Sequence, residues 1–308
     1  MHKPTIGIIG GTGLGDALGR RLKDVTTQRP ETPFGLPSAP IQIGTLGPAR
    51  IAFLSRHGDG HTLNPSQVPY AANIFALKKL GVTTLVASAA VGSLQQEIAP
   101  ADLVLVDQFI DKTIRRQNTF FDALGAVHTE FADPCCRRLR EKLLAAGQTV
   151  SARVHPAGTY VCMEGPQFST RAESIMHRQW GADLIGMTAL PEAKLAREAQ
   201  MCYALVALVS DYDCWRKHDP NQDSQSLLEE IIGNLTAATQ NAIQLIERLL
   251  ETDGDLAEDA CPCRRSLARA VWTRPEALDP RQRQRLAAGL YLCLLRPGKP
   301  LFNTAAPA

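Results

Sequence analysis

The alternation of short, strongly apolar runs with segments of helical periodicity constrains the fold of this chain most. The apolar runs are four to seven residues long and are bounded by Gly, Pro, Asp or Ser, which is typical of buried strands. They occupy residues 5–9, 51–54, 83–87, 103–106, 150–154, 184–187 and 203–209.

Between these runs, apolar residues recur every three or four positions. In residues 70–80, Ala71, Ile74 and Leu77 fall on one helical face. Further helices are predicted at 134–146, 171–180, 191–201 and 227–250. Because the strands are near-continuous apolar runs and do not strictly alternate with polar residues, we expect an α/β fold with a mostly parallel or mixed sheet covered by helices.

The length of 308 residues permits one large α/β domain or two smaller ones. The composition changes near residue 250, since 251–259 is acidic and 261–308 holds eight Arg and one Lys against two acidic residues. Leu267 and Trp272 contribute to an apolar face on this basic tail. We expect one domain over 1–250 and a helical C-terminal appendage over 251–308 with a frayed end at 297–308. A polyanion-binding arm is the alternative.

Charge and composition argue against several classes of function. Lys and Arg number 33 against 31 Asp and Glu, and a net charge of +2 is far below the basic excess of nucleic-acid-binding domains. The longest apolar stretches are shorter than the roughly 18 residues that span a bilayer, and the N-terminus lacks signal-peptide features. Eight cysteines without paired Cys-x-x-Cys motifs suggest neither a disulfide scaffold nor structural zinc. We expect a cytoplasmic protein with buried, reduced thiols and no metal, membrane or nucleic-acid partner.

A glycine turn, Gly10-Gly11-Thr12-Gly13, follows the first predicted strand. Asp16 stands where the dinucleotide fingerprint needs its last glycine and where a P-loop needs its lysine, so both motifs fail. The remaining motif offers backbone N–H groups and a hydroxyl to a small anion. A purely structural turn fits it equally well.

Arg56 and His57 follow a second predicted strand, at the position where open α/β sheets place their ligands. The planar guanidinium suits phosphate oxygens, and the imidazole adds a donor. A surface pair without a ligand is the alternative. His57 and His61 have the spacing of metal ligands, but Gly58 and Gly60 disfavour the helix that this spacing needs.

Two carboxylates, Asp211 and Asp213, follow the strongly apolar run at 203–209. On an extended strand, residues two apart point the same way. In a dry pocket, at least one of the two has a raised pKa, as a general acid or a recogniser of an amine beside a ring nitrogen requires. A solvated loop is the alternative.

Aromatic and hydroxyl side chains accompany two further segments. Phe168 lies between a Gly-Pro pair and a helix start, where Ser169 or Thr170 with Glu173 forms a capping motif. Such a ring belongs either to the core or against a flat ligand. Thr188 adds a hydroxyl after the run at 184–187.

In order and in register, these motifs resemble the 5'-methylthioadenosine phosphorylases of the purine nucleoside phosphorylase superfamily. The resemblance extends from about residue 5 to 250, and Cys261-Pro262-Cys263 resembles the tail of bacterial and archaeal members. It rests on Gly10-Gly11-Thr12-Gly13, Thr32-Pro33-Phe34-Gly35, Arg56-His57-Gly58, Asp107-Gln108-Phe109-Ile110-Asp111, Glu164-Gly165-Pro166, Gly181-Ala182-Asp183, Met187-Thr188 and Asp211-Tyr212-Asp213-Cys214-Trp215.

The resemblance implies a single α/β domain around a mixed, distorted central sheet flanked by helices, with 1–250 as the catalytic domain. It also implies a homotrimer that uses phosphate as co-substrate and needs no cofactor. The expected reaction is phosphorolysis of 5'-methylthioadenosine to adenine and 5-methylthioribose 1-phosphate, a pentosyl transfer in purine and methionine salvage.

The same resemblance assigns roles to individual residues. Asp211 donates or shares a proton at purine N7, and Asp213 accepts from the 6-amino group. The phosphate site comprises Thr12, Arg56, His57, the backbone at Ala90 and Thr188. The nucleoside site comprises Met187 and His61 near the ribose, Phe168 and Ser169 beside the purine, and Leu228 with a neighbour's His128 around the methylthio group.

The chain departs from the family pattern at Ala89. Relatives usually have Thr or Ser before the alanine of the phosphate-binding strand, whereas this chain has Ala89, so a side-chain donor is missing unless Ser88 or a water replaces it.

Cys261 and Cys263 carry a further expectation. Their spacing is associated in relatives with disulfide redox chemistry, although reduced thiols are the default in a cytoplasmic protein.

Three other functions are considered. A broader purine nucleoside phosphorylase, or a 5'-methylthioinosine phosphorylase, would act on 6-oxo purines, for which Asn is favoured in place of the Asp211 and Asp213 pair. A nicotinamide-dependent dehydrogenase conflicts with the broken glycine fingerprint. A nucleoside-binding protein without catalysis is the third.

Overall fold

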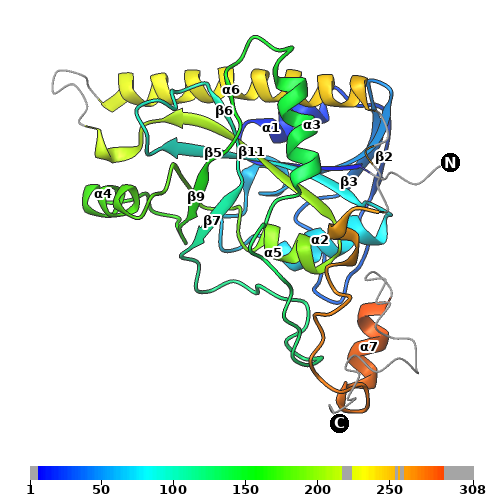
Figure 1. The fold of residues 1–308 in the computed structure, drawn as a ribbon. Helices are drawn as coiled ribbons and strands as arrows, with labels where there is room; N and C mark the ends of the chain where they lie inside the picture. Colours follow the sequence, from blue (N-terminus) through cyan, green and yellow to red (C-terminus); the bar gives the residue numbers. More distant parts are fainter. Residues whose placement is uncertain (1–5, 217–223, 254–255, 257–259, 288–308) are drawn as a thin grey trace.

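The computed structural model describes residues 6–216, 224–253, 256 and 260–287, which form helices on both faces of a central sheet (Figure 1). Its strands belong to a single mixed sheet in the order β2-β3-β4-β1-β5-β10-β9-β7, with β11, β6 and β8 branching from β5. The strands are β1 Ile6–Gly10, β2 Lys23–Gln28, β3 Ile41–Leu46, β4 Ala49–Ser55, β5 Thr84–Ser93, β6 Leu103–Leu105, β7 Gln108–Asp111, β8 Val154–His155, β9 Thr159–Cys162, β10 Leu184–Gly186 and β11 Cys202–Asp211.

Strand β5 is the branch point of the sheet. It pairs in parallel with β1 and β11, and its last residues, Gly92 and Ser93, also pair antiparallel with β10. The register between β5 and β11 shifts between Val209 and Asp211. This bulge and the branching distort the sheet and gather the ends of β1, β4, β5, β10 and β11 in one region.

Helices cover both faces of the sheet. The helices are α1 Leu14–Gly19, α2 Tyr70–Lys79, α3 Arg137–Gly147, α4 Arg171–Gln179, α5 Glu192–Glu198, α6 Ser224–Thr252 and α7 Pro280–Ala287. One buried cluster joins apolar residues of α2 and α5 to the sheet, and a second joins those of α1, α3 and α6 to it. Figure 1 shows α6 extending across one side and α2 and α5 lying on the other.

The predicted α/β fold is confirmed, including the mixed and distorted sheet. The predicted helices match α2 to α6 within a few residues. Of the run at 150–154, only its last residue, Val154, belongs to a strand. The sequence analysis missed α1, β2, β3, β7 and β9; β2 is exposed throughout and therefore lacks the apolar signal of a buried strand.

The described part of the C-terminal tail packs against the main core. Leu267, Val271 and Leu278 belong to the same buried cluster as α2 and α5. Two short 3-10 helices, Pro262–Arg265 and Pro275–Ala277, precede α7. The expected frayed end at 297–308 lies outside the described residues, and the domain boundary at 250 stays a prediction. Within the part of the chain that the structure describes, no helix has the length and apolar character to cross a membrane.

Candidate active site

A fully buried arginine lies beneath the glycine turn. Arg56 follows β4 and is 0% exposed; its Nε and Nη2 donate to the Glu192 carboxylate at 2.7 and 2.8 Å. Burial by itself lowers the pKa of Arg56, but the Glu192 carboxylate outweighs it and holds that pKa above its usual value. The guanidinium therefore stays charged and fixed, with Tyr203 Oη donating to the same carboxylate at 3.0 Å.

The glycine turn lies directly against this arginine. The Arg56 Nη1 group donates to the Ser88 carbonyl at 2.7 Å, and the Gly11 N–H reaches the Ser88 hydroxyl at 3.3 Å. A Cβ on Gly11 would lie 2.7 Å from Arg56 Nη1 and 2.9 Å from the Ser88 carbonyl oxygen. This position therefore requires glycine because of the close approach, and Ser88 anchors the turn.

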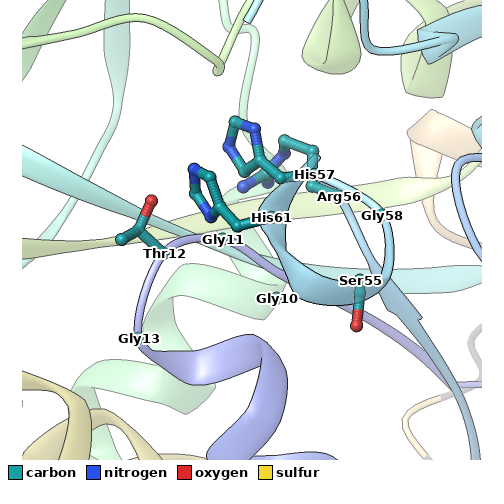
Figure 2. Close-up of a pocket in the computed structure, with 9 residues that line it drawn as sticks. All are labelled: Gly10, Gly11, Thr12, Gly13, Ser55, Arg56, His57, Gly58 and His61. Atoms are coloured by element: carbon teal, nitrogen blue, oxygen red, sulfur yellow. The ribbon is translucent and has the colours of Figure 1, made fainter. Parts of the chain in front are cut away.

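Two stacked histidines stand at the opening of this pocket. The rings of His57 and His61 lie 4.3 Å apart, and Figure 2 shows both beside Thr12, with Arg56 behind His57. Burial, with the Arg56 charge adding to it, lowers the pKa of His57 to about 4, so its ring is neutral near pH 7. Its Nδ1 lies 2.8 Å from the Leu63 carbonyl, which can only accept. The proton is therefore on Nδ1, and Nε2 carries the lone pair.

The structure brings together three of the predicted phosphate residues. Thr12, Arg56 and His57 line one pocket with His61 and the glycine turn. Its lining residues are Gly10, Gly11, Thr12, Gly13, Ser55, Arg56, His57, Gly58 and His61. A fixed guanidinium, turn N–H groups and a hydroxyl form a site for a small, multiply charged oxyanion.

The other two predicted phosphate residues lie on adjoining elements. Ala90 is on β5, two residues after Ser88, and Ala89 between them is buried in the core. Thr188 is buried in the loop after β10, and its N–H donates to Tyr160 Oη at 3.3 Å. Neither residue is among those that line the pocket around Arg56, so their part in a phosphate site stays a prediction.

The carboxylate pair lies against the end of β5. A Cβ on Gly92 would be 3.1 Å from both Asp211 Oδ1 and Asp213 Cβ. The Asp211 carboxylate accepts from the Ser210 hydroxyl at 2.6 Å and from the Asp213 N–H at 2.7 Å. Both Asp211 carboxylate oxygens thereby accept hydrogen bonds, and Asp211 pairs across the sheet with Gly92, which is two residues along β5 from Ala90.

Asp213 has a different environment. Its Oδ2 and the hydroxyl of nearby Ser174 are both buried without a partner of good geometry among the described residues. Burial raises the pKa of Asp213, and the Ser174 hydroxyl opposes part of that rise. Asp213 is therefore prepared to hold a proton before a ligand arrives, whereas the resemblance gave the proton to Asp211.

The predicted nucleoside residues lie in different surroundings. Ser169 accepts through its carbonyl from Cys214 Sγ at 3.3 Å, which ties the loop before α4 to the carboxylate segment. Met187 packs on Gly165, where a Cβ would lie 2.5 Å from its sulfur. Phe168 is 86% exposed and Leu228 56% exposed, so a single chain leaves both side chains largely open to solvent. His128 is exposed and lies by Trp272 at 5.5 Å.

The sequence carries no signal for the residues that hold the loops around Glu164 and Met187 in place. Arg116 donates to the carbonyls of Met187 and Leu190 at 2.6 and 2.7 Å and to that of Glu164 at 2.7 Å. Although burial opposes it, hydrogen bonds from Ser66 and from backbone N–H groups, together with the Arg116 charge, lower the pKa of Glu164 to about 2. Glu192 was missed as well, because nothing in its local sequence shows that it pairs with a residue 136 positions away.

Similarity to known proteins agrees with this geometry. A family model described as the phosphorylase superfamily matches residues 5–251. The chain belongs to this superfamily. It is 46% identical to the S-methyl-5'-thioadenosine phosphorylase of Geobacter sulfurreducens, an alignment that covers 91% of this chain and 96% of that protein. It is 45% identical to the enzyme of the same name from Gloeobacter violaceus, covering 92% and 94%.

Solved structures of this superfamily show the same fold. A methylthioadenosine phosphorylase from an Antarctic soil metagenomic library matches with a TM-score of 0.84 and 43% identity over 94% of this chain and all of that one. The Schistosoma mansoni adenosine/methylthioadenosine phosphorylase variant S12T, in complex with methylthioadenosine, matches with a TM-score of 0.76 and 32% identity over 94% and 99%.

The buried ion pair of the phosphorylase pocket gives the first testable prediction. Replacing Glu192 with Gln leaves the Arg56 charge buried without its counter-ion, and we expect a loss of about 3–5 kcal/mol in the free energy of unfolding. Urea denaturation measures it. In the matched control Glu141→Gln, the pair with Arg137 is largely exposed, and the free energy of unfolding should hardly change. Equal losses in the two variants would contradict the role given to the buried pair.

Proposed function

We propose that this chain is a pentosyltransferase that catalyses phosphorolysis of 5'-methylthioadenosine to adenine and 5-methylthioribose 1-phosphate. One observation carries the proposal: β5 joins the oxyanion pocket to the carboxylate pair. Ala90 and Gly92 are two residues apart on this strand, about 7 Å at the usual rise. That span suits a phosphate below a ribose C1' whose purine meets the carboxylates. The names of the relatives and structural neighbours support the same substrate.

The reaction needs a positioned nucleophile and a proton for the departing purine. A phosphate oxygen forms a bond to C1' as the C1'–N9 bond breaks, and the bonding pair leaves with adenine. The phosphate charge stabilises the oxocarbenium-like state, so the protein mainly supplies position and exclusion of water. Thr12, Arg56, His57, the backbone at Ala90 and Thr188 are assigned to phosphate.

The neutral His57 ring adds a specific requirement. Because Nδ1 donates to Leu63, Nε2 can only accept a hydrogen bond at neutral pH. Near pH 7, phosphate carries a proton on at least one oxygen in both of its main forms, H2PO4⁻ and HPO4²⁻. His57 therefore accepts from a phosphate hydroxyl, while Arg56 and the turn donate to the unprotonated oxygens.

We assign Asp211 and Asp213 to the N7 and 6-amino edge of adenine as a pair that shares one proton. A protonated carboxyl donates to N7 and facilitates departure of the purine, and the ionised one accepts from the amino group. The raised pKa of Asp213, caused by burial, supports a proton resting on that side chain. The fixed acceptor geometry of Asp211 supports an ionised partner.

The remaining expectations belong to this proposal. Apolar side chains that a single chain leaves exposed, Phe168, Leu228 and Ile114, suit a homotrimer in which His128 of a neighbouring subunit closes the methylthio pocket. We further propose a cytoplasmic enzyme of purine and methionine salvage that uses phosphate as co-substrate and needs no cofactor for the reaction.

Adenine release tests the proposed reaction directly. With phosphate we expect rapid release and a phosphorylated sugar product, whereas in phosphate-free buffer release should nearly stop, because the proposed site holds phosphate as the nucleophile. Chromatography of adenine and ³¹P NMR of the sugar measure the two products. Equal release rates in both buffers would refute phosphorolysis, and nucleoside binding without release would indicate the non-catalytic alternative.

Ala89 gives a prediction about phosphate affinity. Replacing Ala89 with Thr restores the missing donor and should lower the apparent phosphate constant by up to about tenfold, equivalent to about 1.4 kcal/mol. Ala89→Val is the matched control, because it adds the same bulk to this buried position without a hydroxyl. If the folded Thr and Val variants had equal phosphate constants, Ser88 or a water would already fill the role.

Asp211 gives a prediction about the purine. A carboxylate opposite the carbonyl of a 6-oxo purine sets acceptor against acceptor, whereas Asn can donate to it. Replacing Asp211 with Asn should therefore reduce kcat/KM strongly for methylthioadenosine and less for methylthioinosine, shifting their ratio by at least about tenfold. Asp24→Asn, on the distant strand β2, should change neither. A proportional fall for both substrates would remove the main support for the adenine preference.

A further inference from the structure

Four cysteine side chains from distant parts of the chain form one compact, buried cluster. The sulfur atoms of Cys136, Cys202, Cys261 and Cys263 all lie within 4.8 Å of one another, and all four residues are buried. The Sγ atoms of Cys136 and Cys261 are 3.7 Å apart, with no disulfide between them. This four-cysteine cluster lies outside the residues assigned to phosphate and nucleoside.

The spacing of the sulfurs matches that of a tetrahedral metal thiolate. With zinc–sulfur bonds of about 2.3 Å, the sulfurs of a site with four thiolate ligands lie about 3.8 Å apart. A disulfide would bring two of them to about 2.05 Å. The 3.7 Å separation of Cys136 and Cys261 fits one edge of the tetrahedron, and the 4.8 Å upper limit means that all four sulfurs are close enough to bind one ion.

The four sulfurs come from three separate segments. Cys136 is the N-cap of α3, Cys202 begins β11, and Cys261 and Cys263 flank Pro262 at the short 3-10 helix after α6. The helix N-cap adds a favourable dipole for a thiolate at Cys136. The convergence explains why sequence spacing gave no zinc signal: only Cys261 and Cys263 are close in the chain, and they lack the usual two-residue spacer.

Two arginines lie against the cluster. Arg138 Nη2 is 4.0 Å from Cys202 Sγ, and Arg197 Nη1 is 4.0 Å from Cys263 Sγ. Four thiolates around a divalent ion carry a net charge of −2, which two guanidinium groups balance. A pair of disulfides is neutral and would not be stabilised by either cation, of which Arg138 is half-buried and Arg197 also lies 3.9 Å from the Glu130 carboxylate.

We propose that the four-cysteine cluster binds one Zn²⁺ in a closed, structural site. Each thiol loses its proton to solvent as the ion binds, and the four sulfurs fill the coordination sphere, which leaves no position for a substrate. The proposal departs from the expectation of reduced thiols without metal, and it does not depend on the reaction proposed above.

The site would fasten the C-terminal segment to the domain. Beyond Cys263, this segment pairs with the loop that carries His128: the His128 N–H donates to the Ala270 carbonyl at 2.8 Å, and the Trp272 N–H donates to that of Ala126 at 2.9 Å. Zinc at its base would therefore order the segment against which His128 is held.

Metal content of the purified full-length chain tests the site. We expect about one zinc per chain by mass spectrometry after growth in zinc-containing medium and purification without chelator. Cys263→Ala should lose the zinc, whereas the matched control Cys135→Ala, a buried cysteine outside the cluster, should retain it. Exchange of zinc for Co²⁺ in the wild-type chain should give the visible and near-ultraviolet bands of tetrahedral cobalt thiolate, a result that needs no variant to fold.

Thiol counting separates zinc from disulfides. After denaturation with a chelator, all eight cysteines should react without a reductant. A count that rises by about four on reduction would show two disulfides and overturn the proposal. So would a chain that lacks zinc and gives no cobalt spectrum, zinc retained by Cys263→Ala, or iron in place of zinc.

Discussion

The pairing of one buried guanidinium with one buried carboxylate is the constraint on which the proposed active site depends. Neither Arg56 nor Glu192 is more than 1% exposed, and a charge at such depth is stable only with a partner and satisfied hydrogen bonds. The Arg56 Nε and Nη2 groups donate to the Glu192 carboxylate, and Nη1 donates to the Ser88 carbonyl. Since a guanidinium has five N–H groups, two remain for an anion in the pocket.

The glycine turn and strand β5 both contact this buried arginine. The turn can approach Arg56 only because Gly11 has no side chain. Strand β5 supplies the Ser88 carbonyl to the arginine and, four residues later, Gly92 to the carboxylate pair. In the proposed site, β5 would therefore lie along both ends of the nucleoside, and the bulge after Val209 brings Asp211 to Gly92.

Sequence patterns predicted the parts of this arrangement that are local. Apolar runs predicted the central strands, and the polar residues after them predicted the pocket around Arg56 and His57. Contacts between distant positions could not be predicted in this way: Glu192 is 136 residues from Arg56, and Cys136 is 125 from Cys261. The division of protons between Asp211 and Asp213 also depends on burial, which the sequence does not specify. Exposed β2 shows that a strand without an apolar face escapes detection.

We propose that the arginine fixed by Glu192 makes this pocket an oxyanion site. Calorimetric titration with phosphate alone, in the absence of nucleoside, tests it most directly when the wild-type chain is compared with Arg56→Lys. A lysine keeps the charge beside Glu192 but loses the planar guanidinium, which can donate hydrogen bonds to the carboxylate and to the anion at the same time. We expect one phosphate per chain for the wild type and binding weaker by at least about tenfold for the variant, equivalent to about 1.4 kcal/mol. Equal phosphate affinity in the two folded proteins would contradict it.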